Sequence, residues 1–259
     1  MKVLAAKYNY LVKTYMKSYR KYPLGLFLKL VYLPIQLFMY LFLWIAVSQN
    51  SKIDLNYMVC YYLLVSLLGY AYPFVHIAKD IQEDIIEGGI SNYLVRPLSY
   101  MSPMLSKYIA WMCLYAIVYI PALGFIFFFR GIEIGNILMF LVLAILGMGI
   151  EFLIWYNVGL LSFHLGKIGG TVTAIMALRT LISGALIPLS FFPDFLQNLS
   201  WFFPFQYYIY IPVNSLLNGV GSVSFLTITG IEVLWIVGLS LLGMFQWNLG
   251  LKKHQVSIS

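Results

Sequence analysis

The sequence predicts an all-α polytopic membrane protein in which residues 1–259 form a single transmembrane domain with six transmembrane helices. Of these residues, 62% are hydrophobic and only 10% are charged, whereas a soluble chain carries about 25% charged residues. The apolar residues occur in long runs, and a helix of about 20 apolar residues crosses a hydrocarbon core of about 30 Å. Seven basic residues and no acidic residue lie among the first thirty positions, which is typical of a cytoplasmic membrane anchor and not of a nucleic-acid site.

Residues 4–22 predict an amphipathic helix that lies in the membrane interface. Apolar and aromatic side chains share one helical face, and basic side chains that suit anionic headgroups share the other. A soluble helix packed on a partner is the alternative, but a long apolar run follows at once and favours the interface. The apolar face holds Leu4, Tyr8, Leu11, Val12, Tyr15, Met16 and Tyr19, and the basic face holds Lys13, Lys17, Arg20 and Lys21.

Six apolar runs are expected to span the membrane as helices. A proline inside a helix removes a backbone hydrogen bond, so Pro121 predicts a kink in the third span. Gly147, Gly149 and Gly159 in the fourth span would allow a neighbouring helix to approach closely. The spans are expected at about 24–47, 55–78, 103–129, 136–163, 171–189 and 223–246.

Residues 187–221 are apolar and aromatic, but they cannot form one continuous transmembrane helix because four prolines interrupt them. We expect short re-entrant helices that dip into the outer leaflet between spans five and six, where aromatic residues are common. Asp194 is the only charged residue of this segment. The prolines are Pro188, Pro193, Pro204 and Pro212.

The distribution of basic residues orients the chain, because cytoplasmic segments carry an excess of lysine and arginine. With the N-terminus in the cytoplasm, the inner segments hold thirteen of the sixteen basic residues. The outer loops then hold only Lys52 and Arg130, and Arg179 lies within a span. Both termini are therefore expected in the cytoplasm, together with the loop between spans two and three.

That loop, residues 79–99, is expected to dock on a cytoplasmic partner. Its acidic residues recur at helical spacing and predict the polar face of a short amphipathic helix. Ile81, Ile85 and Ile86 are expected on the opposite face of this helix. The acidic residues are Asp80, Glu83, Asp84 and Glu87.

Two glycines follow the acidic residues and are expected to end the helix. Gly88 and Gly89 suit a helix end because glycine readily adopts the left-handed backbone conformation. A second apolar turn is then expected, and Pro97 closes the segment by biasing Arg96 away from helix. This second turn comprises Ile90, Tyr93 and Leu94.

The residue pattern indicates no catalytic or metal site in this chain. Asp80 and Asp84 resemble half of the paired aspartate signature that holds magnesium and diphosphate in intramembrane prenyl transferases, and a lipid-modifying enzyme of that kind is an alternative hypothesis. The other inner loop, 164–170, lacks the second acidic motif that such an enzyme needs. The chain has no Walker phosphate-binding motif. Cys60 and Cys113 fall inside apolar spans, where small buried hydrophobic side chains are expected.

Three charged residues lie inside predicted spans, where a charge is costly and by default marks function. Arg179 is expected to form a buried ion pair with Glu151 that fixes the helix register. Lining of a polar pathway is an equal alternative for Arg179. Glu232 is expected near the outer interface, where the cost of its charge is small.

Six spans, an N-terminal interfacial helix, a cytoplasmic docking loop and a broken outer segment together resemble the ABC-2 type permeases, the membrane subunits of type V ABC exporters. The sharpest local match is E-G-G-I-S-N-Y-L-V-R-P-L-S at 87–99. It resembles the family pattern of an acidic helix, a glycine and Leu-x-x-Pro, and its Y-L-x-R-P-L-S part resembles a bacterial subgroup. The architectural resemblance covers nearly the whole chain.

The resemblance implies a transport subunit that is not an enzyme and binds no cofactor itself. ATP and Mg would bind to two copies of a separate ABC ATPase subunit. A second permease, identical or different, would complete an exporter among the lipids of the bacterial inner membrane. A structural membrane subunit without a pathway is the remaining alternative.

The same resemblance assigns roles to segments of the chain. Residues 4–22 would be the connector helix, and 187–221 would roof the outer side of the pathway. The loop between spans two and three would carry a coupling helix that enters a groove on the ATPase. Its coupling residues would be Asp80, Glu83, Asp84, Glu87, Gly88, Gly89, Tyr93, Leu94, Arg96 and Pro97.

Overall fold

The protein is a bundle of helices. The computed structural model describes residues 2–19, 23–48, 54–71, 74–94 and 99–256, and every regular element in these ranges is helical. The prediction of an all-α chain is therefore confirmed for this part of the protein. In order, the elements are α1 (Lys2–Tyr19), α2 (Pro23–Ser48), α3 (Leu55–Ala71), α4 (Phe74–Ile86), α5 (Ser91–Leu94), α6 (Met101–Arg130), α7 (Ile134–Leu160), α8 (Ser162–Leu165), α9 (Gly169–Ile182), η1 (Leu189–Phe191), α10 (Asp194–Ser200), η2 (Pro204–Tyr208), α11 (Tyr210–Asn218) and α12 (Ser222–Val256).

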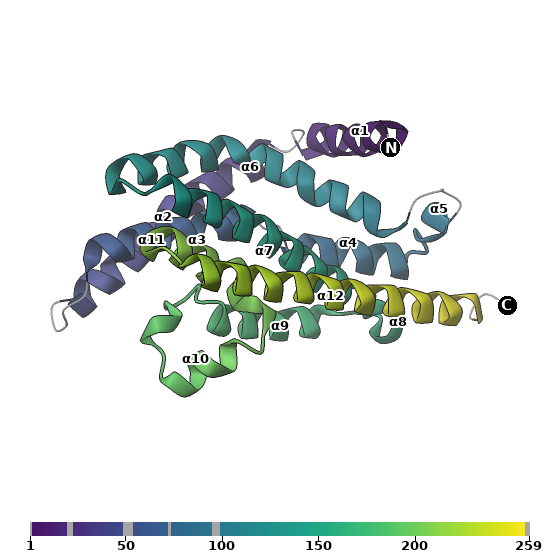
Figure 1. Ribbon diagram of the computed structural model, residues 1–259. Coiled ribbons are helices and arrows are strands. Elements are labelled where there is room, and N and C mark those ends of the chain that lie inside the picture. Colours follow the sequence, from purple (N-terminus) through teal and green to yellow (C-terminus); the bar gives the residue numbers. More distant parts are fainter. Residues whose placement is uncertain (1, 20–22, 49–53, 72–73, 95–98, 257–259) are drawn as a thin grey trace.

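The helix α7 forms the centre of the bundle. It packs against α4, α11, α12 and η2, and its residues 150–160 are all buried. Figure 1 shows that α4, α5, α8 and the C-terminus lie at one end of the bundle, whereas the turn between α6 and α7 lies at the other. Figure 1 also shows that α6 is bent, which is in line with the proline inside it.

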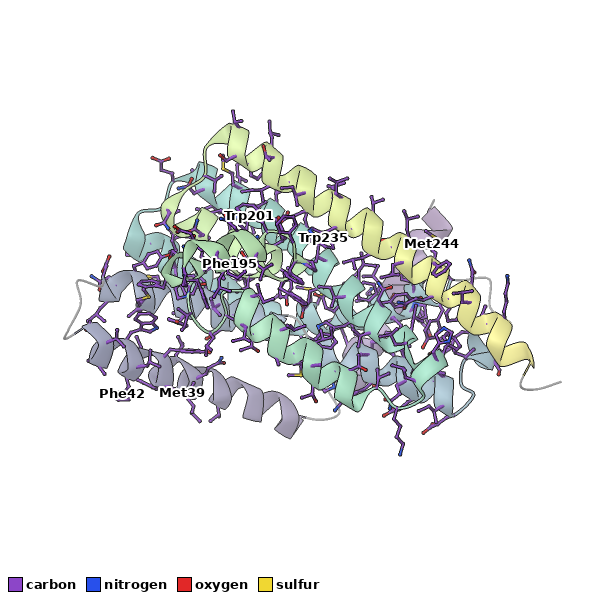
Figure 2. The ribbon with its side chains drawn as sticks, turned by 90° about the horizontal axis from the view of Figure 1, so that it is seen from below. Met39, Phe42, Phe195, Trp201, Trp235 and Met244 are labelled. Atoms are coloured by element: carbon purple, nitrogen blue, oxygen red, sulfur yellow. The ribbon has the colours of Figure 1, made fainter. Side chains whose placement is uncertain are left out.

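Two helical stretches in the described ranges are long and apolar enough to cross a membrane. They are Ile134–Leu165, with 32 residues and a mean hydropathy of 2.7, and Val223–Lys252, with 30 residues and a mean hydropathy of 2.0. The outer surface of the bundle is also apolar. In Figure 2, Met39 and Phe42 of α2 point away from the bundle, and they are 59% and 70% exposed. Such side chains suit contact with lipid.

The N-terminal helix is amphipathic where its side chains are described. Tyr15 and Met16 are half-buried, whereas Lys13 and Lys17 are exposed. The helix packs alongside α6, where the Lys107 ammonium lies 5.7 Å from the centre of the Tyr15 ring. Its position in the membrane interface stays a prediction.

The second predicted span, 55–78, corresponds to more than one helix in the structure. The structure divides it into α3, which ends at Ala71, and α4, which begins at Phe74 and continues through the acidic residues. The sequence has Pro73 at this division, and a proline cannot continue the helical hydrogen-bond ladder. The acidic helix is therefore longer than predicted, because its first turns come from the end of the expected span.

In the fifth predicted span, 171–189, the helix is shorter than expected. α9 has 14 residues, which at about 1.5 Å per residue gives only about 21 Å. Gly184, with a φ of 79°, follows its end, and the Tyr61 hydroxyl donates a hydrogen bond of 2.7 Å to the Gly184 carbonyl. A Cβ at this glycine would lie 2.9 Å from the Tyr61 oxygen, so α3 fixes the chain here in a conformation that suits glycine.

Residues 187–221 form short helices rather than one long helix, as predicted. Pro188 and Pro193 directly precede η1 and α10, and Pro204 begins η2. All five residues of η2 are buried. The depth of this segment in a bilayer stays a prediction.

The predicted close approaches to the fourth span are confirmed at two of three glycines. A Cβ on Gly147 would lie 2.7 Å from the Tyr208 Cα, and a Cβ on Gly159 would lie 2.8 Å from the Ile81 Cβ. At Gly149 the nearest atom is 3.4 Å away, which is an ordinary contact. These glycines let η2 and α4 pack directly on α7.

The last helix continues ten residues beyond the predicted end of the sixth span at 246, because α12 reaches Val256. Trp247 in this extension stacks on Tyr100, with ring centres 4.8 Å apart and an interplanar angle of 11°. The extension therefore packs on the residue that begins the return from the 79–99 segment into α6.

Candidate functional site

The four acidic residues of α4 and its C-terminal end do not share one environment. Asp80 and Asp84 face the rest of the bundle, whereas Glu83 and Glu87 are exposed. The Asp80 carboxylate accepts a hydrogen bond of 2.9 Å from the Lys107 ammonium. The Asp84 carboxylate accepts one of 2.7 Å from the Tyr100 hydroxyl. The predicted acidic face is therefore split into an inner pair and an outer pair.

The isoleucines of α4 divide in the same way. Ile81 and Ile85 are buried, with exposed fractions of 0% and 7%, but Ile86 is 51% exposed. The prediction that Ile86 lies opposite the acidic residues is thus wrong. Residues three and four apart share a helical face, so Ile86 lies on the same exposed side of α4 as Glu83. We call Lys79, Glu83, Ile86 and Glu87, all exposed, the outer face of α4.

The predicted helix end at the two glycines is confirmed. α4 ends at Ile86, and Gly88 has a φ of 73°. The Ile90 amide donates a hydrogen bond of 3.0 Å to the Asp84 carbonyl, which turns the chain back onto α4. Ile90 is fully buried, and the second predicted turn forms as α5.

Some predicted coupling residues fall outside what the structure describes. Tyr93 is half-buried, and its ring lies 5.0 Å from the ring of Tyr100. The side chain of Leu94, and all of Arg96 and Pro97, lie outside the described residues. Their assignment to coupling stays a prediction.

Tyr100 connects the 79–99 segment with the long helices. Its hydroxyl contacts Asp84, its ring stacks on Trp247 of α12, and the ring of Tyr156 of α7 lies 6.5 Å away. Burial and then the hydrogen bond to the Asp84 carboxylate raise the pKa of the Tyr100 phenol. The phenol is therefore a neutral donor, and it joins α4 to α12 and α7 at the start of α6.

Sequence reasoning did not identify Tyr100 or Lys107 as partners of the loop. Asp80 and Asp84 are four residues apart, and Tyr100 and Lys107 are seven apart, so each pair lies on one face of its helix. In the sequence α6 follows α4 after α5, and the structure pairs Asp84, near the end of α4, with Tyr100 at the start of α6, and Asp80, one turn earlier, with Lys107 farther along α6. This complementary spacing is the signal that could have predicted both contacts.

Two further contacts fix α4. The Ile168 amide donates a hydrogen bond of 2.8 Å to the Gln82 side-chain carbonyl, which connects α4 with the start of α9. Ile81 packs on Gly159 of α7, where a larger residue would not fit. α4 is therefore attached to α6, α7 and α9, and the residues of its outer face are exposed to a partner.

The predicted ion pair within the spans is confirmed. The Arg179 Nε lies 3.5 Å from the Glu151 Oε1, and Glu151 has no exposed side-chain surface. The same oxygen accepts a hydrogen bond of 2.9 Å from the Trp155 indole. The Arg179 guanidinium also lies 5.4 Å from the centre of the Tyr208 ring. This pair joins α7, α9 and η2 in the interior of the bundle.

Glu232 was expected near the outer interface, where its charge would cost little, but the structure buries its side chain completely. The expectation of a small cost is therefore wrong, whereas the position of Glu232 relative to the interface stays a prediction. Neither carboxylate oxygen has a hydrogen-bond partner among the described residues. The burial was missed because α12 packs on η2, and the position of η2 cannot be read from the pattern of α12 itself.

The contacts also bear on the alternative of a lipid-modifying enzyme. Asp80 and Asp84 would have to bind a metal ion, but they are engaged by Lys107 and Tyr100. Among the described residues, no group of three His, Cys, Asp or Glu side chains is placed to hold a metal ion. The observed arrangement gives Asp80 and Asp84 a role in holding α4 on α6.

Comparison with known proteins identifies the family. A family model described as ABC-2 family transporter protein matches residues 30–257. No curated protein matches the chain. The match covers most of the chain, including the segment around α4 and all of α6, α7 and α12. The chain therefore belongs to the ABC-2 transporter family, as a multi-pass membrane protein with the role of a permease and not of a catalyst.

Proposed function

We propose that this chain is the permease subunit of an ATP-driven ABC exporter, and that a separate ATPase subunit binds the outer face of α4. The observation that carries the proposal is the division of α4 into two sides. Its inner residues are attached to the bundle, whereas Lys79, Glu83, Ile86 and Glu87 are exposed. An exposed apolar residue between two carboxylates suits a partner groove with basic rims.

The complete transporter would contain two ATPase copies and two permeases, identical or different. The chain would have six spans in a bacterial inner membrane, with both termini and α4 in the cytoplasm. The position of the C-terminus at the same end of the bundle as α4 supports this orientation (Figure 1). The thirteen basic residues of the predicted inner segments support it as well.

The contacts of α4 suggest how movement would pass into the membrane. ATP binding would draw the two ATPase subunits together and carry α4 with them. The Asp80 and Asp84 contacts would transmit the displacement to α6, and the Tyr100–Trp247 stack would transmit it to α12. α4 would transmit its displacement in this way only while these contacts are intact. Energy passes only if the partner binds differently to the two states.

Co-purification tests the proposal. The tagged protein is isolated in mild detergent, and bound proteins are identified by mass spectrometry. An ABC ATPase should accompany the wild type and be lost with Glu83→Lys/Glu87→Lys. Glu133→Lys is the matched control, because Glu133 is also exposed but lies between α6 and α7 at the opposite end of the bundle (Figure 1). Retention of the ATPase by the double variant, or its absence from the wild type, would refute the proposal.

A second variant separates docking from coupling. Tyr100→Phe removes the 2.7 Å hydrogen bond to Asp84 but leaves the outer face of α4 unchanged. The ATPase should still co-purify, while ATP-driven transport by the reconstituted complex should fall. Full transport activity in this variant would contradict the proposed lever.

A further inference from the structure

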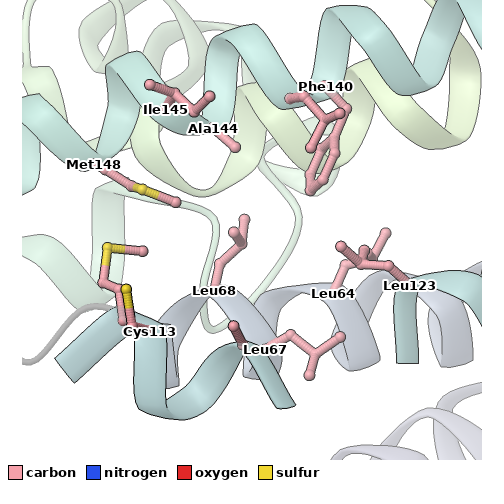
Figure 3. A pocket seen from close by; sticks show the side chains of 12 residues that line it. Leu64, Leu67, Leu68, Cys113, Leu123, Phe140, Ala144, Ile145 and Met148 are labelled. Atoms are coloured by element: carbon pink, nitrogen blue, oxygen red, sulfur yellow. The ribbon is translucent and has the colours of Figure 1, made fainter. Parts of the chain in front are cut away.

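An apolar pocket lies between α3, α6 and α7, away from the ion pair and from α4. Its volume is about 310 Å³, at the lower end of the range of about 300–1,000 Å³ that is typical of ligand pockets. Figure 3 shows side chains of α7 facing those of α3 and α6 across the space. The lining consists of Leu64, Leu67, Leu68, Met112, Cys113, Ala116, Leu123, Phe140, Leu141, Ala144, Ile145 and Met148.

The side chains that line the pocket favour a hydrocarbon chain as the ligand. Its described lining residues comprise aliphatic side chains, two methionines, one phenylalanine and the Cys113 thiol, and none of these carries a charged group, an amide or a hydroxyl. A polar ligand would lose its hydration without gaining hydrogen bonds. An ordered water needs two to four polar partners, and the lining side chains do not offer them.

The mouth of the pocket opens at an apolar surface. Leu141 and Ile145 line the pocket, and they are also 42% and 62% exposed. Leu138 and Val142 extend the exposed stripe along α7 at helical spacing. This stripe belongs to the stretch Ile134–Leu165, which is apolar and long enough to cross a membrane. The molecules that surround the mouth in a bilayer are therefore acyl chains.

We propose that the pocket holds one acyl chain of a membrane phospholipid, which enters laterally past Leu141 and Ile145 and reaches the leucines of α3. The small volume suits one narrow chain rather than a ring system. In the sequence α3 precedes α4 and α6 follows α5, so the acyl chain would fill a space between the helices that lie on either side of the α4–α5 segment in the sequence. Binding depends on the apolar lining and not on the ATPase, so it is tested independently of the proposed function.

The floor of the pocket makes the proposal testable. Leu67 and Leu68 line the pocket and are only 2% and 6% exposed, so lipid that only surrounds the protein cannot reach them. The protein is placed in nanodiscs that contain phosphatidylcholine with a diazirine near the end of one acyl chain. After illumination, labelled residues are mapped by proteolysis and mass spectrometry. Labelling is expected at these leucines as well as at the exposed Met39 and Phe42 of α2.

Pocket-filling variants provide the comparison. Ala144→Phe should reduce labelling of the leucines about tenfold, which corresponds to a loss of about 1.4 kcal/mol, and leave Met39 and Phe42 unchanged. Ala116→Leu is the milder variant if Ala144→Phe does not fold. Val142→Phe is the matched control, because Val142 is exposed on the same helix but does not line the pocket.

Three results would overturn the proposal. The first is labelling of α2 without labelling of the leucines in the wild type. The second is equal labelling of the leucines in the wild type and in a folded pocket-filling variant. Labelling that a free fatty acid diazirine gives, but the phospholipid does not, would also overturn it, because the ligand would then not be a membrane phospholipid.

Discussion

Replacement of Arg179 by leucine should destabilise the protein strongly, because it leaves the buried Glu151 carboxylate without its cation. The two groups are 3.5 Å apart, and at an effective dielectric constant of about 20 their attraction is about 5 kcal/mol. Removal of one member of a buried pair typically costs about 3–5 kcal/mol. We therefore expect Arg179→Leu to lower the free energy of unfolding by about 3–5 kcal/mol.

A double-mutant cycle isolates this interaction. Glu151→Gln removes the charge but keeps an oxygen that can accept the Trp155 indole hydrogen bond. In Glu151→Gln/Arg179→Leu no unpaired charge is buried, so the double variant should be more stable than Arg179→Leu alone. Unfolding in mixed micelles with a denaturing detergent, followed by tryptophan fluorescence, measures all four proteins. Coupling energies between contacting residues are about 0.5–3 kcal/mol.

The result that refutes this reasoning is additivity. If the losses of unfolding free energy in the two single variants add up to the loss in the double variant, Glu151 and Arg179 do not interact as their geometry indicates. Transport by the double variant answers a separate question. A pair that only fixes the packing of α7, α9 and η2 should tolerate the replacement, whereas a pair that lines a polar pathway should not.

Three further variants test the packing described above by the same unfolding measurement. Gly159→Ala should lower the free energy of unfolding by about 1–3 kcal/mol, because its Cβ would lie 2.8 Å from Ile81. Gly238→Ala is the control and should change the free energy of unfolding little, because nothing lies within 4 Å of its Cβ. Equal effects of the two changes would contradict the close approach of α4 to α7. Tyr61→Phe should lower the free energy of unfolding by about 1–3 kcal/mol, because the Gly184 carbonyl loses its buried hydrogen-bond donor. An unchanged stability would show that this hydrogen bond does not hold the chain after α9. Lys107→Met should lower the free energy of unfolding by only about 1 kcal/mol or less, because the ion pair of Lys107 with Asp80 is partly exposed. A loss above about 3 kcal/mol would contradict this expectation.

Patterns within one helix predicted local structure well. The acidic helix, its end at Gly88 and the short helices of 187–221 follow from helical spacing, glycine conformation and proline chemistry. The Glu151–Arg179 pair was predictable because opposite charges inside apolar segments stabilise each other when they pair. Each of these inferences depends on residues whose own chemistry restricts the structure.

Contacts between distant segments were not predictable in the same way. The acidic residues of α4 looked equivalent, because only the positions of Lys107 and Tyr100 divide them into inner and outer pairs. The burial of Glu232 depends on how η2 lies against α12. Likewise, the early end of α9 depends on a tyrosine of α3 that is more than 120 residues away in the sequence.

The most direct test of the central claim is site-specific photo-crosslinking from the outer face of α4. p-Benzoylphenylalanine is introduced at Ile86, which is 51% exposed, or at Ile134, which is 75% exposed at the start of α7. Illumination of cells should link the Ile86 variant to an ABC ATPase, and the link should weaken when Glu83 and Glu87 are reversed in charge. The Ile134 variant should give no such product. An ATPase crosslink from Ile134, or none from Ile86 in a folded protein, would contradict the assignment of α4 as the coupling element.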